Sequence, residues 1–407
     1  MSRYRWVILA AGTTAQTSFT TISVGLPALA PALRSHYRLS LGQVGVVLGA
    51  VGIGMLPTLL PWGLLADRIG ERTVIALGLV GAGAAVCATG LSGSYATLVV
   101  LLIVSGALGA SVNAASGRAV MGWFGAQERG LALGIRQTSV PIGGAAAAAT
   151  LPFLAGAGGT RLAFLTLGAG CIGGGLVAAA LLREAPAHAT PPIDVRPPLR
   201  DVRMWLLAGG SSLYLLAQIA ITTFEVLFLH DRRGLSTHAA ALVLAGTNLL
   251  GIGARIAAGR WSDRLGARIA PLRLIGVGIC AGTFLVAVLV HAPLAVLVPV
   301  IVVAGVLSLT WNGLAFAAAA ETAGAARSGA ALGFQQTMLG VLVAAVPPLF
   351  ALLVDASSWR IAFAVSALGP LVGLLVLGSV PEVRPSPTAA LSLGTSAIPR
   401  AARGTPD

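Results

Sequence analysis

The sequence predicts an all-α integral membrane protein whose twelve transmembrane helices form two pseudo-symmetric six-helix bundles. Three observations predict this class: an apolar composition, a series of apolar windows, and a repeated motif. The chain of 407 residues is 56% hydrophobic and 10% charged, with a mean hydropathy of +0.90. Such a composition leaves too little polar surface to cover a soluble protein of this size, so lipid must surround it.

Twelve windows along the chain approach or exceed the roughly 20 apolar residues that cross a bilayer as a helix. They lie near residues 6–32, 41–62, 74–93, 96–122, 131–156, 162–182, 204–229, 238–257, 271–291, 293–319, 330–354 and 361–380. The first window is too long for a typical secretory signal, so we expect an uncleaved first span. An even number of spans places both termini on one side of the membrane.

A ten-residue motif divides the chain into two related halves. Gly63-Leu64-Leu65-Ala66-Asp67-Arg68-Ile69-Gly70-Glu71-Arg72 reappears 196 residues later as Gly259-Arg260-Trp261-Ser262-Asp263-Arg264-Leu265-Gly266-Ala267-Arg268. Each copy lies between two apolar windows, as a charged turn at a membrane face does. We therefore expect six-helix bundles at residues 1–183 and 204–380. The proline-rich residues 184–203 predict a cytoplasmic linker, and residues 381–407 a cytoplasmic, disordered tail.

The basic residues orient the chain. All 26 of them are arginines, and an N-terminus on the cytoplasmic side puts 19 in inner loops and tails, Arg255 among them. The outer loops then hold only six: Arg34, Arg38, Arg161, Arg232, Arg233 and Arg360. This asymmetry predicts a multi-pass protein of the cytoplasmic membrane with both termini inside. Topology explains the net charge of +13, so we expect lipid rather than nucleic acid as the partner.

The repeated turn, its position after the second and eighth spans, and the twelve-span count resemble the major facilitator superfamily over nearly the whole chain. The resemblance implies a transporter that moves a small solute by alternating access, without enzymatic activity. It also implies a conformational latch on the cytoplasmic side, in which Asp67 meets the start of span eleven and Asp263 the start of span five, near Gly329 and Gly130. The expected latch residues are Gly63, Asp67, Arg68, Gly70, Gly259, Asp263, Arg264 and Gly266.

Packing of the halves is expected at glycines. Gly63 and Gly259 would permit close packing against a helix of the other half. Gly45 and Gly49 would let their helix approach a neighbour closely, as small residues do in membrane proteins.

Arg136 is the most informative single residue because it lies seven residues past Arg129 within an apolar span. A charge inside a span is costly and usually faces a water-filled cavity or a partner, although a snorkelling arginine would also fit. We interpret it as an anchor for an anion or hydrogen-bonding solute. Its counterpart in the second half is Gln335, so we expect a cavity charged on one side only.

Uncharged polar residues recur at mirrored positions and predict the rest of the solute site. Each alone could be an ordinary interhelical hydrogen bond. The candidate residues are Gln16, Gln218, Asn113, Asn312, Gln137, Gln335 and Gln336.

Glu225, in the seventh window, is the candidate for proton coupling. A carboxyl group buried in a span favours its neutral form and can carry a proton. The alternative is a position near the outer interface, since His230-Asp231-Arg232-Arg233 follows shortly after.

The energy source and direction remain open alternatives. The chain has no lysine and therefore no Walker A motif, so we expect an ion gradient, first of all of protons, or the solute's own gradient to drive transport. We expect no cofactor and no metal site, and a monomer. Import of a small organic anion or polar solute is slightly favoured over drug or metabolite efflux by proton antiport, which Pro141, Gly143 and Gly144 suggest. A non-transporting receptor or scaffold is the third alternative.

Overall fold

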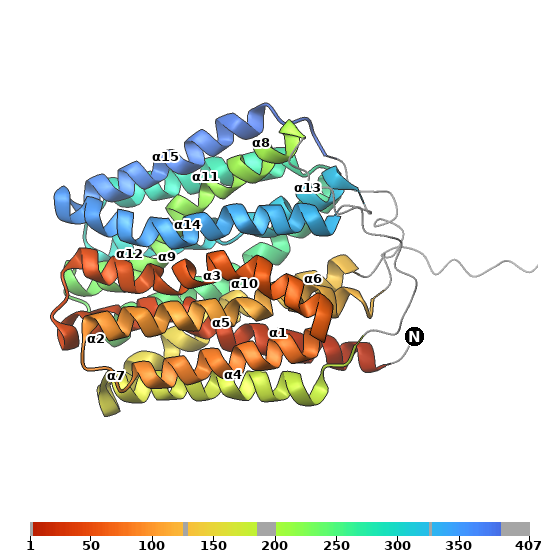
Figure 1. The fold of residues 1–407 in the computed structure, drawn as a ribbon. Helices are drawn as coiled ribbons and strands as arrows, with labels where there is room; N and C mark the ends of the chain where they lie inside the picture. Colours follow the sequence, from red (N-terminus) through yellow and green to blue (C-terminus); the bar gives the residue numbers. More distant parts are fainter. Residues whose placement is uncertain (1–2, 125–128, 185–200, 325–327, 384–407) are drawn as a thin grey trace, which may run out of the picture.

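Fifteen α-helices make up the part of the chain that this computed structural model describes, namely residues 3–124, 129–184, 201–324 and 328–383 (Figure 1). Those residues contain no strand. The first half holds α1 (Tyr4–Ser23), α2 (Leu26–Tyr37), α3 (Leu41–Ile69), α4 (Glu71–Thr89), α5 (Tyr95–Met121), α6 (Arg129–Gln137) and α7 (Ser139–Leu181). The second holds α8 (Val202–Ser212), α9 (Tyr214–Asp231), α10 (Thr237–Leu265), α11 (Ile269–Val288), α12 (Leu294–Ser308), α13 (Trp311–Ala323), α14 (Ser328–Ala356) and α15 (Trp359–Gly378).

These helices account for twelve spans. Ten helical segments of the described residues are long and apolar enough to cross a membrane. One of them, Gly134–Leu181, holds two spans, because the backbone leaves the helical conformation at Gly158 and Gly159, where φ of Gly159 is 66°. Together with α1 and α2 this gives the twelve spans that the sequence predicts.

The first span is rich in threonine and less apolar than the others. In α1 the hydroxyl groups of Thr13, Thr17 and Thr21 donate to carbonyl oxygens four residues earlier, at 2.7–2.8 Å. This back-bonding satisfies the hydroxyls inside the helix itself, so they can enter lipid at low cost.

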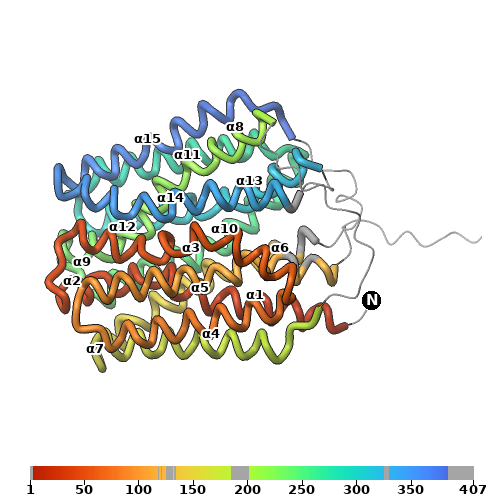
Figure 2. The backbone as a smooth tube through the Cα atoms, in the orientation of Figure 1, coloured from red at the N-terminus to blue at the C-terminus, as the bar shows by residue number. Residues whose placement is uncertain are grey.

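The two halves lie side by side, with α1–α7 in one group and α8–α15 in the other (Figure 1). Figure 2 shows that α1 begins and α15 ends at the same end of the bundle, which we call the termini end. Most of the expected linker and tail, residues 185–200 and 384–407, lies outside the described residues.

Close contact between the halves runs along α3 and α14, as the prediction for Gly45 and Gly49 requires. A Cβ atom at Gly45 would lie 2.5 Å from the Cβ of Ala351 and 2.7 Å from the carbonyl oxygen of Pro347. At Gly49 it would lie 3.0 Å from the carbonyl oxygen of Ala344. Only glycine allows this approach, so the predicted close packing is confirmed.

Two polar contacts join the halves at the opposite end of the bundle. Arg34 of α2 forms an ion pair with Asp231 of α9. The backbone N–H of Gly42, in the first turn of α3, donates to Asp355 of α14 at 2.9 Å. The opposite end is therefore held closed in this structure.

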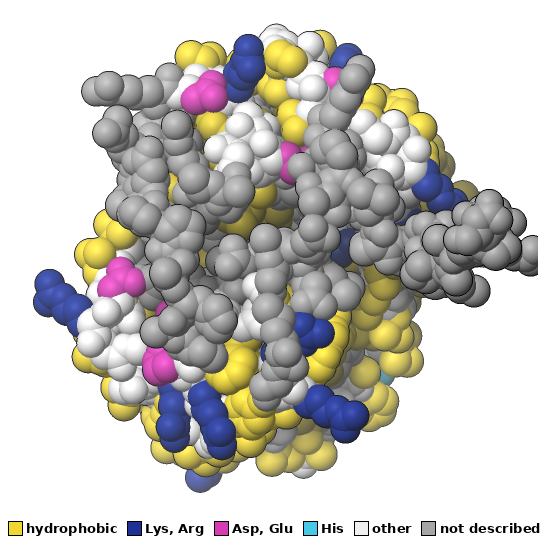
Figure 3. Space-filling view, turned by 90° about the vertical axis from the view of Figure 1, so that its right-hand side faces the viewer, with side chains coloured by type: hydrophobic (Ala, Val, Ile, Leu, Met, Phe, Trp, Pro, Cys, Tyr) yellow, Lys and Arg dark blue, Asp and Glu magenta, His cyan; other side chains and the backbone are white. Residues whose placement is uncertain are grey.

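The termini end carries many of the charged side chains. Figure 3 looks onto this face and shows arginines and acidic side chains around its rim, with hydrophobic side chains between them. The repeated turns contribute Asp67, Arg68, Asp263 and Arg264, all of them exposed. A charged rim around an apolar bundle is expected where the helices leave the bilayer.

Candidate functional site

A hydrogen-bonded cluster in the first half joins Gln16 of α1, Asn113 and Ser116 of α5, and Arg136 of α6. The side-chain amide of Gln16 donates to Asn113 Oδ1 at 2.9 Å. Its carbonyl oxygen accepts from Ser116 at 3.2 Å and from Nη1 of Arg136 at 3.2 Å. Arg136 also donates to Ser116 Oγ at 3.1 Å. Three of these residues were singled out from the sequence, and Ser116 was not.

The second half contains a related but weaker cluster. Gln218 of α9, which mirrors Gln16, accepts from the indole N–H of Trp311 at 3.0 Å and from the amide of Asn312 at 3.4 Å. The mirrored glutamine–asparagine pairs therefore meet in both halves. Gln335, which mirrors Arg136, instead donates to Ser211 of α8 at 2.9 Å and is fully buried.

Arg255 changes the expected charge distribution. The sequence assigned it to an inner loop, which is wrong, because it lies inside α10, eight residues before Asp263. Its Nε donates to the carbonyl oxygen of Leu309 at 3.0 Å, and its Nη1 reaches across to the carbonyl oxygen of Gln137 in the other half at 3.2 Å. Gln137 follows Arg136 in the chain, so Arg255 reaches the segment of the first half that carries Arg136. The expectation of a cavity charged on one side only stays a prediction.

Both guanidinium groups are held by neutral oxygens. Among the described residues neither Arg136 nor Arg255 is hydrogen-bonded to a carboxylate, and Nε of Arg136 is buried without a partner. Arg255 precedes Asp263 by eight residues, which is about 12 Å at the helical rise of 1.5 Å per residue. This spacing is the sequence signal that places Arg255 inside the span.

Gln137 and Gln336 contribute less than their positions suggested. Gln137 accepts a hydrogen bond from Arg255 of the other half through its backbone carbonyl oxygen, and among the described residues its side chain makes no hydrogen bond to the cluster. Gln336 is half-buried on α14 beside Gln335, and no hydrogen bond within the described part of the chain ties it to the cluster. The amide-lined site as a whole stays a prediction.

Glu225 lies inside the bundle, with 1% of its surface exposed. The hydroxyl group of Thr247, on α10, donates to its Oε1 at 3.4 Å, and its Oε2 is buried without a partner. Glu225 lies about 9 Å below Asp231 at the helical rise of 1.5 Å per residue. A position at the interface would leave it exposed, so the geometry favours the buried alternative for this carboxyl group.

The repeated turns have glycines where the backbone needs them. Gly70, which caps α3, has φ 85°, and Gly266, which caps α10, has φ 61°. Such positive angles are easy only for glycine. Elsewhere the expected packing is absent: a Cβ atom at Gly63 or Gly259 would meet no described atom within 4 Å. The close packing predicted there is wrong for this conformation, because the halves are in contact at the opposite end.

Asp263, the acidic residue of the second repeated turn, has an ion-pair partner within its own half. Asp263 accepts from Nη1 of Arg268 at 2.6 Å, within its own half, and Arg268 is held in turn by Glu321 of α13 at 3.0 Å. Segments 125–128 and 325–327, which precede the expected partners of Asp263 and Asp67, lie outside the described residues. The latch, including Arg68 and Arg264, therefore stays a prediction.

No metal-binding group of three or more His, Cys, Asp or Glu side chains occurs in the residues that the structure covers. Cys87, Cys171 and Cys280 are free thiols.

Comparison with known proteins supports a transporter. The sequence model of the Major Facilitator Superfamily matches residues 11–346. An uncharacterised MFS-type transporter of Mycobacterium tuberculosis is 32% identical over 376 residues, which cover 92% of this chain and 84% of that protein. A protein of Cupriavidus necator named as a probable sulfoacetate transporter is 27% identical over 385 residues, covering 88% and 89% of the two chains.

Solved structures share the fold. A bacterial homologue of the human lysosomal transporter Spinster, in an inward-facing and unoccupied conformation, superposes with a TM-score of 0.78 at 16% identity. The alignment covers 95% of this chain and all of that one. The nucleoside transporter NupG superposes with a TM-score of 0.70 at 13% identity, covering 92% and 99%.

Proposed function

Because this chain belongs to the Major Facilitator Superfamily and is a transporter rather than an enzyme, we propose that its solute is a small organic anion. The observation that carries the proposal is the pair Arg136 and Arg255, one from each half, both bonded to neutral oxygens among the described residues. Charges inside spans are costly and mark solute pathways. An anion between the halves would neutralise both.

The chemistry of arginine narrows the class of solute. A guanidinium group presents a planar fork of N–H donors that matches a carboxylate, sulfonate or phosphate oxygen pair. Two guanidinium groups from different halves suit a solute with two separated anionic groups. Sulfoacetate, which the name of the Cupriavidus necator relative specifies, carries a carboxylate and a sulfonate. We infer that small dianions of this kind are the first solutes to test.

Transport would require the closed end of the bundle to open while the other end closes. With the termini on the cytoplasmic side, as the arginine distribution predicts, this structure holds the outer end closed through the ion pair between Arg34 and Asp231. Opening that end would require the halves to rock about the solute, so that the site is reached from each side in turn.

Glu225 supplies a means of coupling to protons. Its buried carboxyl group, bonded only to Thr247 among the described residues, is more stable neutral than charged in these surroundings. A proton taken up there from outside and released inside would accompany an anion inward. We therefore favour import by proton symport in the cytoplasmic membrane.

Efflux by proton antiport is the second candidate. Gly143 and Gly144 on α7 bring neighbouring helices close: a Cβ atom at Gly144 would lie 2.7 Å from Oδ1 of Asn248 in the other half. Together with Pro141, these glycines resemble part of the antiporter signature of drug exporters. Val140 replaces the glycine that precedes this proline in the signature, and Ser105 stands where such exporters carry an arginine, so efflux is the weaker candidate.

The test is flux in liposomes with an imposed pH gradient. Sulfoacetate, malonate, a sugar phosphate, a neutral sugar and a cationic dye are offered to the purified protein. We expect uptake of sulfoacetate and malonate, which carry two separated anionic groups, driven by external acid, and loss of this uptake in Arg136→Gln and in Arg255→Gln. Arg273→Gln, an exposed arginine of α11, is the matched control and should transport normally.

Three outcomes would decide between the alternatives. Unaltered dianion uptake in both central variants would refute the anion site. Dye extrusion coupled to proton entry would establish efflux instead. Solute binding without flux in either direction would favour a receptor.

Glu225→Gln should uncouple uptake from the pH gradient, because the amide cannot carry the proton. Uptake that still responds to the gradient in this variant would show that Glu225 has no part in coupling.

A further inference from the structure

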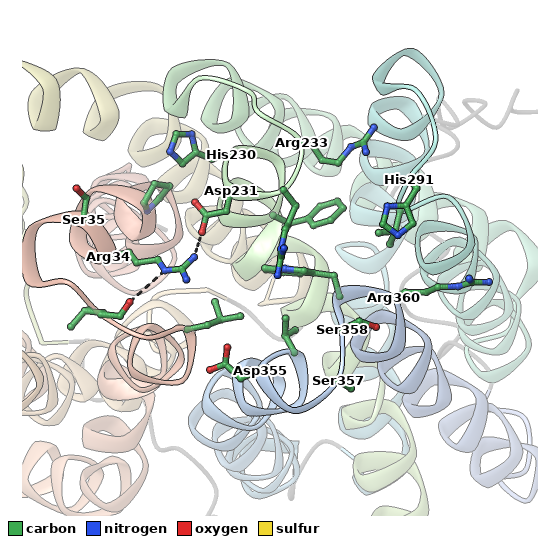
Figure 4. Close-up of a pocket in the computed structure, with 18 of the residues that line it drawn as sticks. Arg34, Ser35, His230, Asp231, Arg233, His291, Asp355, Ser357, Ser358 and Arg360 are labelled. Atoms are coloured by element: carbon green, nitrogen blue, oxygen red, sulfur yellow. Dashed lines mark hydrogen bonds and ion pairs between the residues drawn. The ribbon is translucent and has the colours of Figure 1, made fainter.

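A pocket opens at the end of the bundle opposite the termini, between the two halves (Figure 4). Its volume is about 1100 Å³. Its walls come from α2, the α9–α10 turn, the α11–α12 turn and the junction of α14 with α15. Two buried aromatic side chains, Phe228 and Trp359, also line it.

Arginines converge on this pocket. Five of them line it: Arg34, Arg38, Arg232, Arg233 and Arg360. These are five of the six arginines that the sequence assigns to outer loops, and Arg161 is the one left out. Arginine is depleted from outer loops because it opposes their translocation. The few that remain nevertheless gather at one place from separate segments of both halves.

The acidic residues of the pocket do not cancel this charge. Only Asp231 and Asp355 belong to its lining. Asp231 is paired with Arg34, and Asp355 accepts from the backbone N–H of Gly42. Within the described part of the chain Arg34 is the only one of the five arginines with an ion pair. Arg38, Arg232 and Arg360 are exposed, so their charges face the pocket and the solvent around it.

The backbone at Arg38 adds a second, independent observation. Arg38 caps α2 with φ 53° and is the only described residue other than glycine with a positive φ. Helices usually place glycine or asparagine at such a cap, because a Cβ atom is strained there. An arginine at this cap makes the fold less stable than a glycine would. Its positive charge at the pocket would explain why an arginine stands there.

We propose that this pocket is a second anion-binding site, which collects small multiply charged organic anions from the outer compartment before the halves open. The site rests on the proposed function and on the orientation with the termini inside. Its volume exceeds that of a small dianion, so the anion is held with its water and weakly, as capture before transfer requires. A focused positive field in such a cleft raises the local concentration of anions.

The experiment measures the local potential through thiol chemistry and needs no transport. Ser357, an exposed pocket residue, is changed to cysteine in a full-length chain in which Cys87, Cys171 and Cys280 are replaced by alanine. The protein is placed in phosphatidylcholine liposomes. Reaction rates are compared for a negatively charged sulfonatoethyl and a positively charged trimethylammonium-ethyl methanethiosulfonate. Ser94→Cys, in the exposed α4–α5 turn outside the pocket, is the matched reference.

We expect the ratio of anionic to cationic reaction rates at position 357 to exceed that at position 94 by about tenfold at low salt. The excess should shrink in salt, since screening shortens the range of the field to about 8 Å near 0.15 M. Arg38→Asn together with Arg232→Gln should abolish the excess, and Arg161→Gln should leave it intact. Asparagine tolerates the backbone at residue 38, so loss of folding would not explain the change.

Added malonate should slow the reaction at position 357 and not at position 94. Equal rate ratios at the two positions, or no protection by malonate, would overturn the proposal. Protection by phosphatidylglycerol liposomes without malonate would also overturn it, because the pocket would then hold a lipid headgroup. Failure of the proposed function would appear as unaltered dianion flux in Arg136→Gln. The thiol reaction rates at positions 357 and 94 do not depend on that flux, so the two failures are distinguishable.

Discussion

Arg136 and Arg255 are positioned by different kinds of contact. Arg136 is held by two side chains of its own half, Gln16 and Ser116. Arg255 is held by backbone carbonyl oxygens of both halves, at Leu309 and Gln137. The bond to Gln137 spans the interface along which the halves must move. Arg255 is therefore suited to sense their relative position as well as the solute.

Arg255→Lys tests the geometry of this contact. Lysine keeps the charge but presents a single ammonium group, which cannot donate along both directions that the guanidinium group uses. Losing a hydrogen bond of a charged group costs about 1.5–3 kcal/mol, so the KM for a transported dianion should rise by about ten- to a hundredfold. The measurement is initial uptake in liposomes. Arg273→Lys is the control, and an unchanged KM in Arg255→Lys would refute the role of the fork.

Gly45→Ala tests the close approach of α3 to α14. The added methyl group would come within 3.0 Å of the carbonyl oxygen of Pro347 and of the Cβ of Ala351, so the helices must separate. We expect destabilisation of about 1–3 kcal/mol, seen as a lower midpoint of thermal unfolding in detergent. Gly253→Ala on α10 meets open space and should be neutral or stabilising by up to about 1 kcal/mol. Equal unfolding midpoints for the two variants would contradict the packing argument.

At the scale of the helices, the start of α11 depends on a residue far away in the sequence. The carboxylate of Glu382, just past α15, accepts from the backbone N–H groups of Arg268 and Ile269, both at 2.7 Å, and of Ala270 at 2.9 Å. A negative charge at a helix start is favourable, because the first N–H groups have no partner within the helix. The contact ties the last helix of the second half to α11.

Glu382→Gln should loosen this cap. The amide keeps the size of the side chain but removes the charge, with an expected cost of about 1 kcal/mol. Hydrogen exchange of the first amides of α11 should accelerate by about fivefold, while the first turn of α15, capped by Ser358, stays unchanged. Exchange that accelerates equally at both helix starts would indicate general destabilisation rather than a lost cap.

Hydropathy alone predicts where the transmembrane spans lie, and the places where a helix is broken have physical causes. Residues 131–156 and 162–182 were predicted as two spans, and the chain turns between them at Gly158 and Gly159. The first window, 6–32, corresponds to two helices, α1 and α2, that are interrupted at Val24 and Gly25. Pro27 lies in the first turn of α2 and has no N–H to continue the hydrogen bonds of α1, a feature that hydropathy alone does not show.

At the scale of the whole molecule, the two ends of the bundle differ in what joins the halves. The opposite end has the ion pair of Arg34 with Asp231 and the contact of Gly42 with Asp355. At the termini end, a Cβ atom added at Gly63 or Gly259 would meet no described atom of another helix within 4 Å. The structure is therefore one conformation of a molecule whose halves are expected to rock.

Cysteine labelling tests the orientation of the whole chain. Asp67→Cys and Asp263→Cys should react with an impermeant thiol reagent only when the cytoplasmic side is exposed, because both turns lie at the termini end. Ser94→Cys and Ser357→Cys should react only from outside. All four positions are exposed, which makes them accessible to the reagent. Labelling of positions 67 and 263 from opposite sides would refute the duplicated twelve-span arrangement.

The sequence by itself determined the spans, the duplication and the mirrored polar positions, because hydropathy and repetition are written along the chain. It led to Arg136, Gln16 and Asn113, which meet, and to Gln218 and Asn312, which meet in the other half. Only the tertiary structure decided that Arg255 reaches Gln137, 118 residues away, and that five arginines from separate segments share one pocket. Both depend on how helices of different halves pack, and no local pattern of residues encodes that packing.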